Sequence, residues 1–242
     1  MLRQDGRDNN DLRKCRITRN INDYAEGSCL IVVGNTRVHC TASVEDRQPH
    51  FLRDTEKGWV TAEYSMLPRA TNTRNRRERD TGPSGRSQEI QRLIGRSLRV
   101  VCDTNLLGPR TIQIDCDVMQ ADGGTRTAAI TGAFVALADA CAWLRENKGL
   151  KRWPLLDQVA ATSLGIVSGE VLLDLAYVEA GQGVSGLIAR FTGRGGIVEV
   201  QGTGERAPFS RQQLDAMVEL GAEGCRQLFE IQREALGDVL PG

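Results

Sequence analysis

The residues best suited to bind an anion are Gly123, Gly124, Thr125 and Arg126, which follow one another in the chain. Two glycines permit backbone angles that other residues resist, and they let the main chain approach a ligand closely. A threonine hydroxyl and an arginine fork can both hydrogen-bond to phosphate oxygens. We therefore expect these four residues to hold a phosphate group; the alternative is an ordinary turn that carries a surface arginine.

The segments on either side predict how these residues are presented. Residues 111–118 alternate polar and apolar side chains, as a half-buried strand does. Beyond the glycines, apolar residues recur at helical spacing from Ile130 to Leu144. The loop is therefore predicted to join a strand to a helix N-terminus, where unpaired amides and the helix dipole favour an anion.

The composition of the 242-residue chain excludes several other kinds of site. Lys and Arg together number 31, as do Asp and Glu, so any attraction to a polyanion must come from local clusters of charge. The seven cysteines form no C-x-x-C pair and there are two histidines, which argues against a disulfide framework, a zinc site or a histidine-rich metal cluster. No apolar run is long enough to span a bilayer, so we expect a cytoplasmic protein without membrane contact.

A second feature suited to anions is the basic loop, which we define as residues 69–86. It holds six arginines against Glu78 and Asp80, and Gly82 and Pro83 interrupt regular structure. Such a patch is suited to an RNA backbone, although a solvated linker is the alternative. The arginines of the loop are Arg69, Arg74, Arg76, Arg77, Arg79 and Arg86.

A helix predicted from Ser87 carries Arg92, Arg96 and Arg99 on its outer face. These three side chains form either a solvated face or an RNA-binding stripe. Arg86 differs because it lies at the start of this helix, where it could supply a second phosphate-binding group.

The remaining periodicities predict an α+β fold. The predicted elements are a hairpin over 29–33 and 37–44, a strand over 59–66, four β-like segments over 159–167, 171–178, 187–192 and 197–201, and a last helix over 210–236. This order suggests one domain over 1–242 made of two related halves, approximately 1–150 and 151–242, each a sheet covered by helices.

With these elements in place, the sequence resembles bacterial ribonuclease PH over most of its length. The resemblance does not rest on one motif, because matching segments recur in the same order and spacing along the chain. They are residues 26–30, 40–44, 58–64, 66–70, 88–98, 115–118, 120–127 and 198–203.

The resemblance implies a ribonuclease PH-like fold with two βαβα-type halves and mixed sheets. It also implies a phosphate-dependent 3′-to-5′ exoribonuclease, a tRNA nucleotidyltransferase that trims precursor tRNA or other RNA, including rRNA, and releases nucleoside diphosphates. Inorganic phosphate is the co-substrate, and the subunits form a hexameric ring of dimers. Residue by residue, the resemblance assigns phosphate binding to Gly124, Thr125, Arg126 and Arg86, of which Arg86 and Arg126 are catalytic, and RNA binding to Arg69, Arg74, Arg76, Arg77 and Arg92.

The chain departs from the family where magnesium is held. Two aspartates bind the metal in ribonuclease PH, and the corresponding positions here are Ala180 and Gly186. Neither offers a side-chain oxygen, so no metal ligand is assigned. If the predicted strand over 171–178 continued to Ala180, Glu179 would point to the opposite face from Ala180, and Asp174 would lie ~20 Å from Ala180 along the strand.

Three functions therefore remain open. The first is an active phosphorolytic enzyme that uses Glu179, Glu199 or magnesium bound to the substrate. The second is a hydrolytic or otherwise altered exoribonuclease on the same fold, and the third is a non-catalytic RNA-binding ring subunit. The retained Arg86 and Arg126 favour the first function, whereas the missing aspartates favour the other two.

Overall fold

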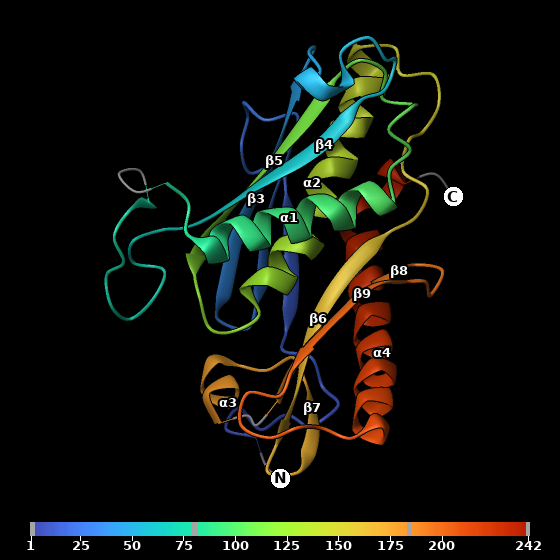
Figure 1. The fold of residues 1–242 in the computed structure, drawn as a ribbon. Coiled ribbons are helices and arrows are strands. Elements are labelled where there is room, and N and C mark those ends of the chain that lie inside the picture. The colour runs from blue at the N-terminus through green and yellow to red at the C-terminus, as the bar shows by residue number, and fades with distance from the viewer. Residues whose placement is uncertain (1–2, 79–81, 183–184, 241–242) are drawn as a thin grey trace.

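A computed structural model of the chain describes residues 3–78, 82–182 and 185–240. The described residues form two sheets with a central helix, α2, between them (Figure 1). Sheet 1 has the order β1-β2-β3-β5-β4, in which β4 runs parallel to β5 and the other neighbours are antiparallel. Its strands are β1 (Cys15–Arg19), β2 (Gly27–Val33), β3 (Thr36–Glu45), β4 (Trp59–Met66) and β5 (Thr111–Gln120).

Sheet 2 is antiparallel throughout and has the order β7-β6-β8-β9. Its central strand β6 is covered on both faces: Val159 and Ala161 pack into the core that α2 shares with sheet 1, whereas Ala160 and Leu164 pack into a second core with α4. The strands are β6 (Val159–Val167), β7 (Glu170–Leu173), β8 (Ser185–Thr192) and β9 (Ile197–Thr203).

Four α-helices complete these layers in the described part of the chain: α1 (Gly85–Val100), α2 (Thr125–Asn147), α3 (Tyr177–Gln182) and α4 (Arg211–Leu236). Ser84 caps α1 by accepting from the Ser87 amide, and Ser210 with Gln213 forms a capping box on α4. By length and composition α2 could cross a membrane, but 89% of its most apolar stretch is buried inside the fold.

Small residues let α2 lie close to sheet 1. A Cβ built on Gly132 of α2 would come within 2.8 Å of Ile31 and 2.9 Å of the Cys40 sulfur. The free cysteines Cys29, Cys40, Cys116 and Cys141 are buried in the same core. Their packing role is therefore as predicted, and the close approach places α2 directly against β2 and β3.

Two sequence-based predictions of elements are corrected. The strand predicted over 171–178 ends at Leu173, because Asp174 adopts a positive φ of 52° and the chain then turns into α3. The short strand β1 (Cys15–Arg19) was not predicted. The hairpin is confirmed as β2 and β3, and the strands predicted over 59–66 and 159–167 have the predicted ends. The other predicted strands and helices are present with shifted ends.

Candidate active site

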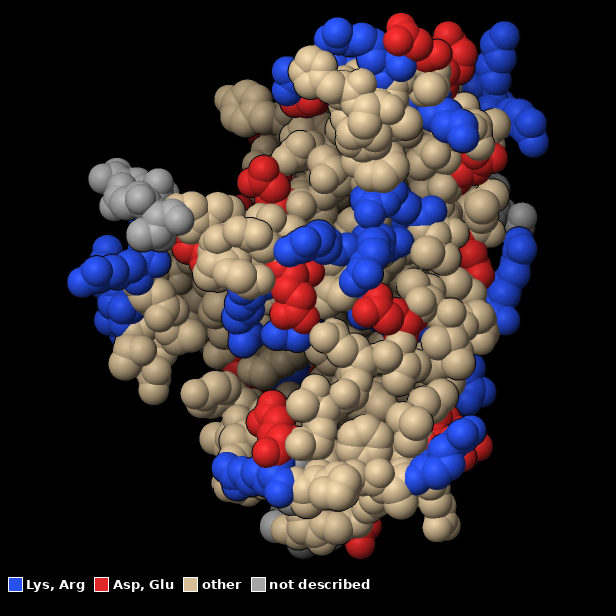
Figure 2. Space-filling view, viewed as in Figure 1, with Lys and Arg blue, Asp and Glu red and all other residues tan. Residues whose placement is uncertain are grey.

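A cavity of about 650 Å³ lies between the two sheets. Figure 2 shows this face of the molecule hollowed between its upper and lower parts. Sheet 1 contributes the β5–α2 loop and the start of the basic loop, and sheet 2 contributes β8, β9 and α3. The lining includes Thr71, Asn72, Asn75, Arg86, Gly123, Gly124, Thr125, Arg126, Tyr177, Ala180, Gly186, Ile188, Gln201, Thr203 and Glu205.

The phosphate loop, which we define as residues 122–126, needs glycine at two positions. Gly123 and Gly124 have φ angles of 77° and 66°, in the left-handed region that other residues avoid. A Cβ on Gly123 would also lie 2.5 Å from the Leu175 carbonyl oxygen and 2.8 Å from the Tyr177 amide nitrogen. No side chain caps the N-terminus of α2, which leaves its first-turn amides to face the cavity. The predicted strand–loop–helix arrangement is confirmed.

Two arginines give this end of the cavity its positive charge. Arg126 lies 3.6 Å from Glu89, measured from Nη1 to Oε1, and Arg86 lines the cavity from the first turn of α1. The Tyr64 hydroxyl donates to Oγ1 of Thr125 at 2.9 Å. Burial raises the pKa of Tyr64, although the Thr125 hydrogen bond and the charges of Arg86 and Arg126 act to lower it. The tyrosine therefore stays protonated and orients the threonine hydroxyl.

The opposite wall carries the two positions that the sequence resemblance aligned with metal-binding aspartates. Ala180 and Gly186 both line the cavity, and Gly186 pairs with Thr203 of β9. Of the described residues in the lining, Glu205 is the one carboxylate. No group of three His, Cys, Asp or Glu side chains that could hold a metal occurs in the described ranges. The residues present therefore do not fit a magnesium site built by this chain alone.

The carboxylates suggested as replacements have other partners. Glu179 accepts from Arg3 at 2.6 and 2.7 Å, and the Glu199 carboxylate lies 2.9 Å from Nη1 of the buried Arg190. Asp174 lies 2.7 Å from Nη2 of Arg13. None of these three carboxylates lines the cavity. The strand argument used for Glu179 and Asp174 was wrong, because β7 ends at Leu173 and Glu179 lies in α3. Both carboxylates lie within 3.7 Å of the Arg7 guanidinium.

The basic loop contributes Arg86 to the cavity, whereas Arg69, Arg74, Arg76 and Arg77 are exposed and lie outside the lining. Their neighbours Thr71, Asn72 and Asn75 do line it, so the loop runs along the cavity mouth. Arg79 lies outside the described residues.

Of the three arginines predicted on the outer face of α1, Arg92 differs from Arg96 and Arg99, which contact side chains outside the helix. Arg92 is exposed on the outer face of the helix. Arg99 stacks 4.3 Å from the centre of the Trp59 ring, and Arg96 lies 3.5 Å from Glu199. Arg96 and Arg99 therefore do not form a free stripe with Arg92.

Sequence reasoning missed Arg13, Thr36, Tyr64 and Glu205. Tyr64 lies in one of the segments that carried the resemblance, but nothing local showed that its hydroxyl reaches Thr125. Arg13 and Thr36 contact the phosphate loop from 109 and 87 residues away, respectively. Such contacts leave no signal in local periodicity.

Comparison with known proteins identifies the family. The model of domain 1 of the 3′ exoribonuclease family matches residues 11–142, and the model of its domain 2 matches residues 157–224. The chain belongs to the 3′ exoribonuclease family. The resemblance to bacterial ribonuclease PH is thereby confirmed, together with the α+β fold and the phosphate-dependent 3′-to-5′ exoribonuclease activity that it implies.

Individual members of the 3′ exoribonuclease family agree with this assignment. Ribonuclease PH of Moorella thermoacetica is 55% identical over 240 residues, which cover 99% of this chain and 96% of the relative. Ribonuclease PH of Methylobacterium radiotolerans is 54% identical over 236 residues, which cover 97% and 100%.

Solved structures support the fold alone. The Archaeoglobus fulgidus exosome with RNA bound to the active site superposes with a TM-score of 0.80 at 24% identity, covering 94% of this chain and 91% of that one. Rice Rrp46 superposes with a TM-score of 0.75 at 21% identity, covering 98% and 100%.

Proposed function

We propose that the cavity is the phosphorolytic active site and that the phosphate loop and Arg86 bind the attacking phosphate. The observation that carries this proposal is a convergence: Arg86 and Arg126, 40 residues apart in sequence, line one cavity with the glycine-rich start of α2. Unpaired amides, a helix N-terminus and two guanidinium groups together are suited to a phosphate dianion.

The reaction requires positioning and charge stabilisation. An oxygen of inorganic phosphate attacks the phosphorus of the last phosphodiester, and the bond from phosphorus to the 3′ oxygen breaks. The terminal nucleotide leaves as a nucleoside diphosphate. The released 3′ oxygen takes up the proton of the attacking hydrogen phosphate and becomes the 3′ hydroxyl of the shortened RNA. Because both reactants are anions, cationic groups that are fixed before the reaction lower its barrier. Arg86 and Arg126 supply this field.

We assign no protein ligand to magnesium, because Ala180 and Gly186 occupy the wall where the family places its metal-binding carboxylates. We propose that phosphorolysis here proceeds without a resident metal ion. A catalytic metal contributes several kcal/mol, so the reaction is expected to be roughly a thousandfold slower than in a metal-loaded relative.

RNA is proposed to enter along the basic loop, where Arg69, Arg74, Arg76 and Arg77 contact its phosphates and Arg92 extends the same surface. The proposed substrate is the 3′ end of precursor tRNA, in the cytoplasm. A homo-hexameric ring of dimers would bring several basic loops to one RNA. The ring would thereby bind RNA more tightly than a single basic loop does.

One assay tests the proposal. The purified protein is incubated with a 3′-extended tRNA, with and without phosphate and magnesium, and the released nucleotides are identified. Nucleoside diphosphates that form only with phosphate, and without a requirement for magnesium, are the expected result. Nucleoside monophosphates would indicate a hydrolytic enzyme, and binding without shortening would indicate a non-catalytic subunit. Sedimentation of the same sample checks for six subunits.

A further inference from the structure

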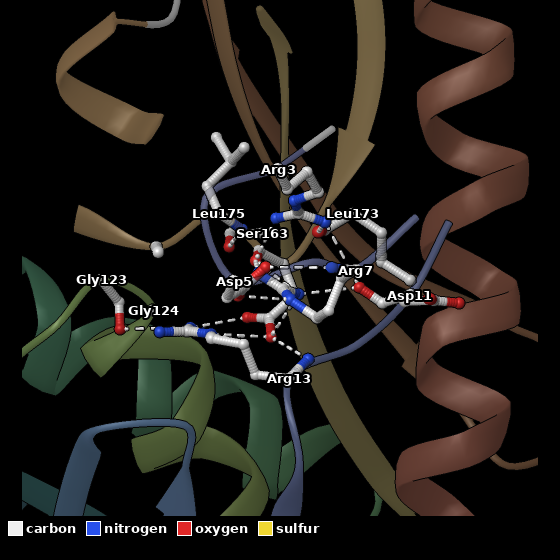
Figure 3. Close-up of polar contacts among 12 residues, drawn as sticks. Arg3, Asp5, Arg7, Asp11, Arg13, Gly123, Gly124, Ser163, Leu173 and Leu175 are labelled. Atoms are coloured by element: carbon white, nitrogen blue, oxygen red, sulfur yellow. Dashed lines mark hydrogen bonds and ion pairs between the residues drawn. The ribbon is translucent and has the colours of Figure 1, made fainter. Parts of the chain in front are cut away.

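Arg13 lies behind the phosphate loop and reaches it from the N-terminal segment (Figure 3). Its side chain is 5% exposed. Nη1 donates to the Asp122 carbonyl at 2.5 Å, and Nη2 donates to the Gly123 carbonyl at 3.4 Å. Thr36 adds a second donor, because its hydroxyl reaches the Gly123 carbonyl at 2.6 Å. Two consecutive carbonyl groups of the phosphate loop are thus held from the same side.

The direction of these carbonyls fixes the direction of the amides. In a trans peptide the C=O and N–H groups point opposite ways. The peptides that contain the Asp122 and Gly123 carbonyls carry the Gly123 and Gly124 amides, and both glycines line the cavity. Neither amide donates to another described residue. Holding the carbonyls at the back of the loop therefore aims two free N–H groups toward the cavity.

Arg13 is itself held by Asp174, at the end of β7. Its Nε and backbone amide donate to Oδ2 of Asp174 at 2.9 and 2.8 Å, and its Nη2 donates to Oδ1 at 2.7 Å. Burial alone would lower the pKa of Arg13, but the Asp174 carboxylate outweighs that effect and the pKa is raised. Arg13 therefore stays charged. Asp174 also leads directly into the Leu175–Tyr177 corner, against which Gly123 packs.

We propose that Arg13 is a positioning residue for phosphate, which acts by orienting the peptide groups of the phosphate loop against Asp174. This inference rests on the proposed function of the cavity. A planar guanidinium has enough donors for both carbonyls and the carboxylate at once, whereas a lysine ammonium is a point charge on a flexible stem. The role should therefore require the arginine fork and not only its charge.

Arg3 provides a matched control. Arg3 lies on the same N-terminal segment and is as well buried as Arg13. It pairs with the carboxylate of Glu179 in α3. Its other hydrogen bonds go to the carbonyls of residues 8, 11, 173 and 174, and none goes to the phosphate loop. Loss of Arg3 should disturb the same region without releasing the loop carbonyls.

The test compares Arg13→Gln, Arg13→Lys and Arg3→Gln in steady-state phosphorolysis. Arg13→Gln is expected to raise the KM for phosphate by about tenfold or more, with the KM for RNA unchanged, because correctly aimed charge-assisted hydrogen bonds are lost. Arg13→Lys should recover stability in urea but not the KM for phosphate. Arg3→Gln should lower stability and leave the KM for phosphate unchanged. If Arg13→Gln and Arg3→Gln have the same effect on the KM for phosphate, the inference is overturned.

Two further measurements separate this inference from the proposed function. Thr36→Val removes the other donor to the Gly123 carbonyl without removing a charge, and it should raise the KM for phosphate in the same direction. Hydrogen exchange of residues 121–127 without phosphate should be faster in Arg13→Gln than in Arg3→Gln. If Arg126→Ala leaves the KM for phosphate unchanged, the phosphate site itself is misassigned; equal exchange in the Arg13 and Arg3 variants refutes the positioning role independently.

Discussion

Arg3 and Glu179 form a bidentate ion pair, with 2.7 Å from Nε to Oε1 and 2.6 Å from Nη2 to Oε2. The two side chains are 1% and 9% exposed. The amide of Ala176 also donates to Glu179 at 2.8 Å. The carboxylate next to Ala180 is therefore committed to the N-terminal segment and is not free to bind a metal ion in the cavity.

The substitution Glu179→Gln should therefore affect folding and not catalysis. Removing one partner of a buried ion pair typically costs about 3 kcal/mol, because the remaining charge is left uncompensated. Urea denaturation of the variant should show a loss of this order, whereas kcat for RNA shortening should change less than twofold. A large fall in kcat with unchanged stability would instead place Glu179 in the reaction.

The same pair predicts how stability depends on pH. Burial acts to raise the pKa of Glu179, but hydrogen bonds from Arg3 and the Ala176 amide, with the charges of Arg3 and Arg7, lower it overall. Because the folded-state pKa lies below the unfolded value of ~4.3, the stabilisation is complete above that value and is lost as the pH falls through the folded-state pKa. The stability difference between wild type and Glu179→Gln should be constant from about pH 6 to 8 and should shrink below about pH 4. A difference that grows toward acid would contradict the pairing.

Restoring carboxylates at the altered wall should restore a response to magnesium. A Cβ built on Gly186 meets nothing within 4 Å, so an aspartate fits there, and Ala180 faces the same cavity. The double variant Ala180→Asp, Gly186→Asp should phosphorolyse RNA at least ~10-fold faster with magnesium than without it, since a bound metal contributes several kcal/mol.

Gly181→Asp is the matched control for that variant. Gly181 is adjacent to Ala180, and a Cβ built on Gly181, like one built on Gly186, meets nothing within 4 Å. Gly181 does not line the cavity. An aspartate there adds one negative charge, half of the charge that the double variant adds, on a side chain outside the cavity, and it should give no magnesium response. A wild-type enzyme that already requires magnesium would show that another group holds the ion.

The basic loop should govern RNA affinity without affecting phosphate. Replacing Arg74, Arg76 and Arg77 by alanine should weaken RNA binding and should reduce the slope of log K against log salt by ~2, since each single-strand contact contributes ~0.7. The KM for phosphate should not change, because none of these arginines lines the cavity. Arg211→Ala, an exposed arginine at the start of α4, serves as the control and should leave the slope unaltered.

Local sequence patterns predicted those parts of the fold that are decided locally. The alternation in residues 111–118 and the helical spacing after Ile130 correctly placed β5, the phosphate loop and α2, because each element buries one continuous set of apolar side chains. The prediction failed over 171–178, where the conformation depends on Asp174 and Glu179. Their partners Arg13 and Arg3 lie 161 and 176 residues earlier in the chain, beyond the reach of any window of periodicity.

The candidate site likewise combines residues that are neighbours in sequence with residues that are far apart in sequence. Gly124, Thr125 and Arg126 are adjacent in sequence, so a phosphate-binding role could be predicted for them directly, and that role stays a prediction. The groups that contact the phosphate loop come from β3, β4 and the segment before β1. The roles assigned to Arg69, Arg74, Arg76, Arg77 and Arg92 stay predictions, because they depend on how RNA and neighbouring subunits are arranged.

The contacts of Arg3 and Arg13 also determine when the phosphate loop can gain its support during synthesis of the chain. Both arginines are synthesised long before their carboxylate partners, which lie 176 and 161 residues later in the chain. Until then the phosphate loop lacks its support from Asp174, and contacts so distant in sequence form late in folding. A growing chain therefore carries the arginines of the basic loop long before Asp174 is present, and a chain that stops short of residue 174 lacks this support for the phosphate loop.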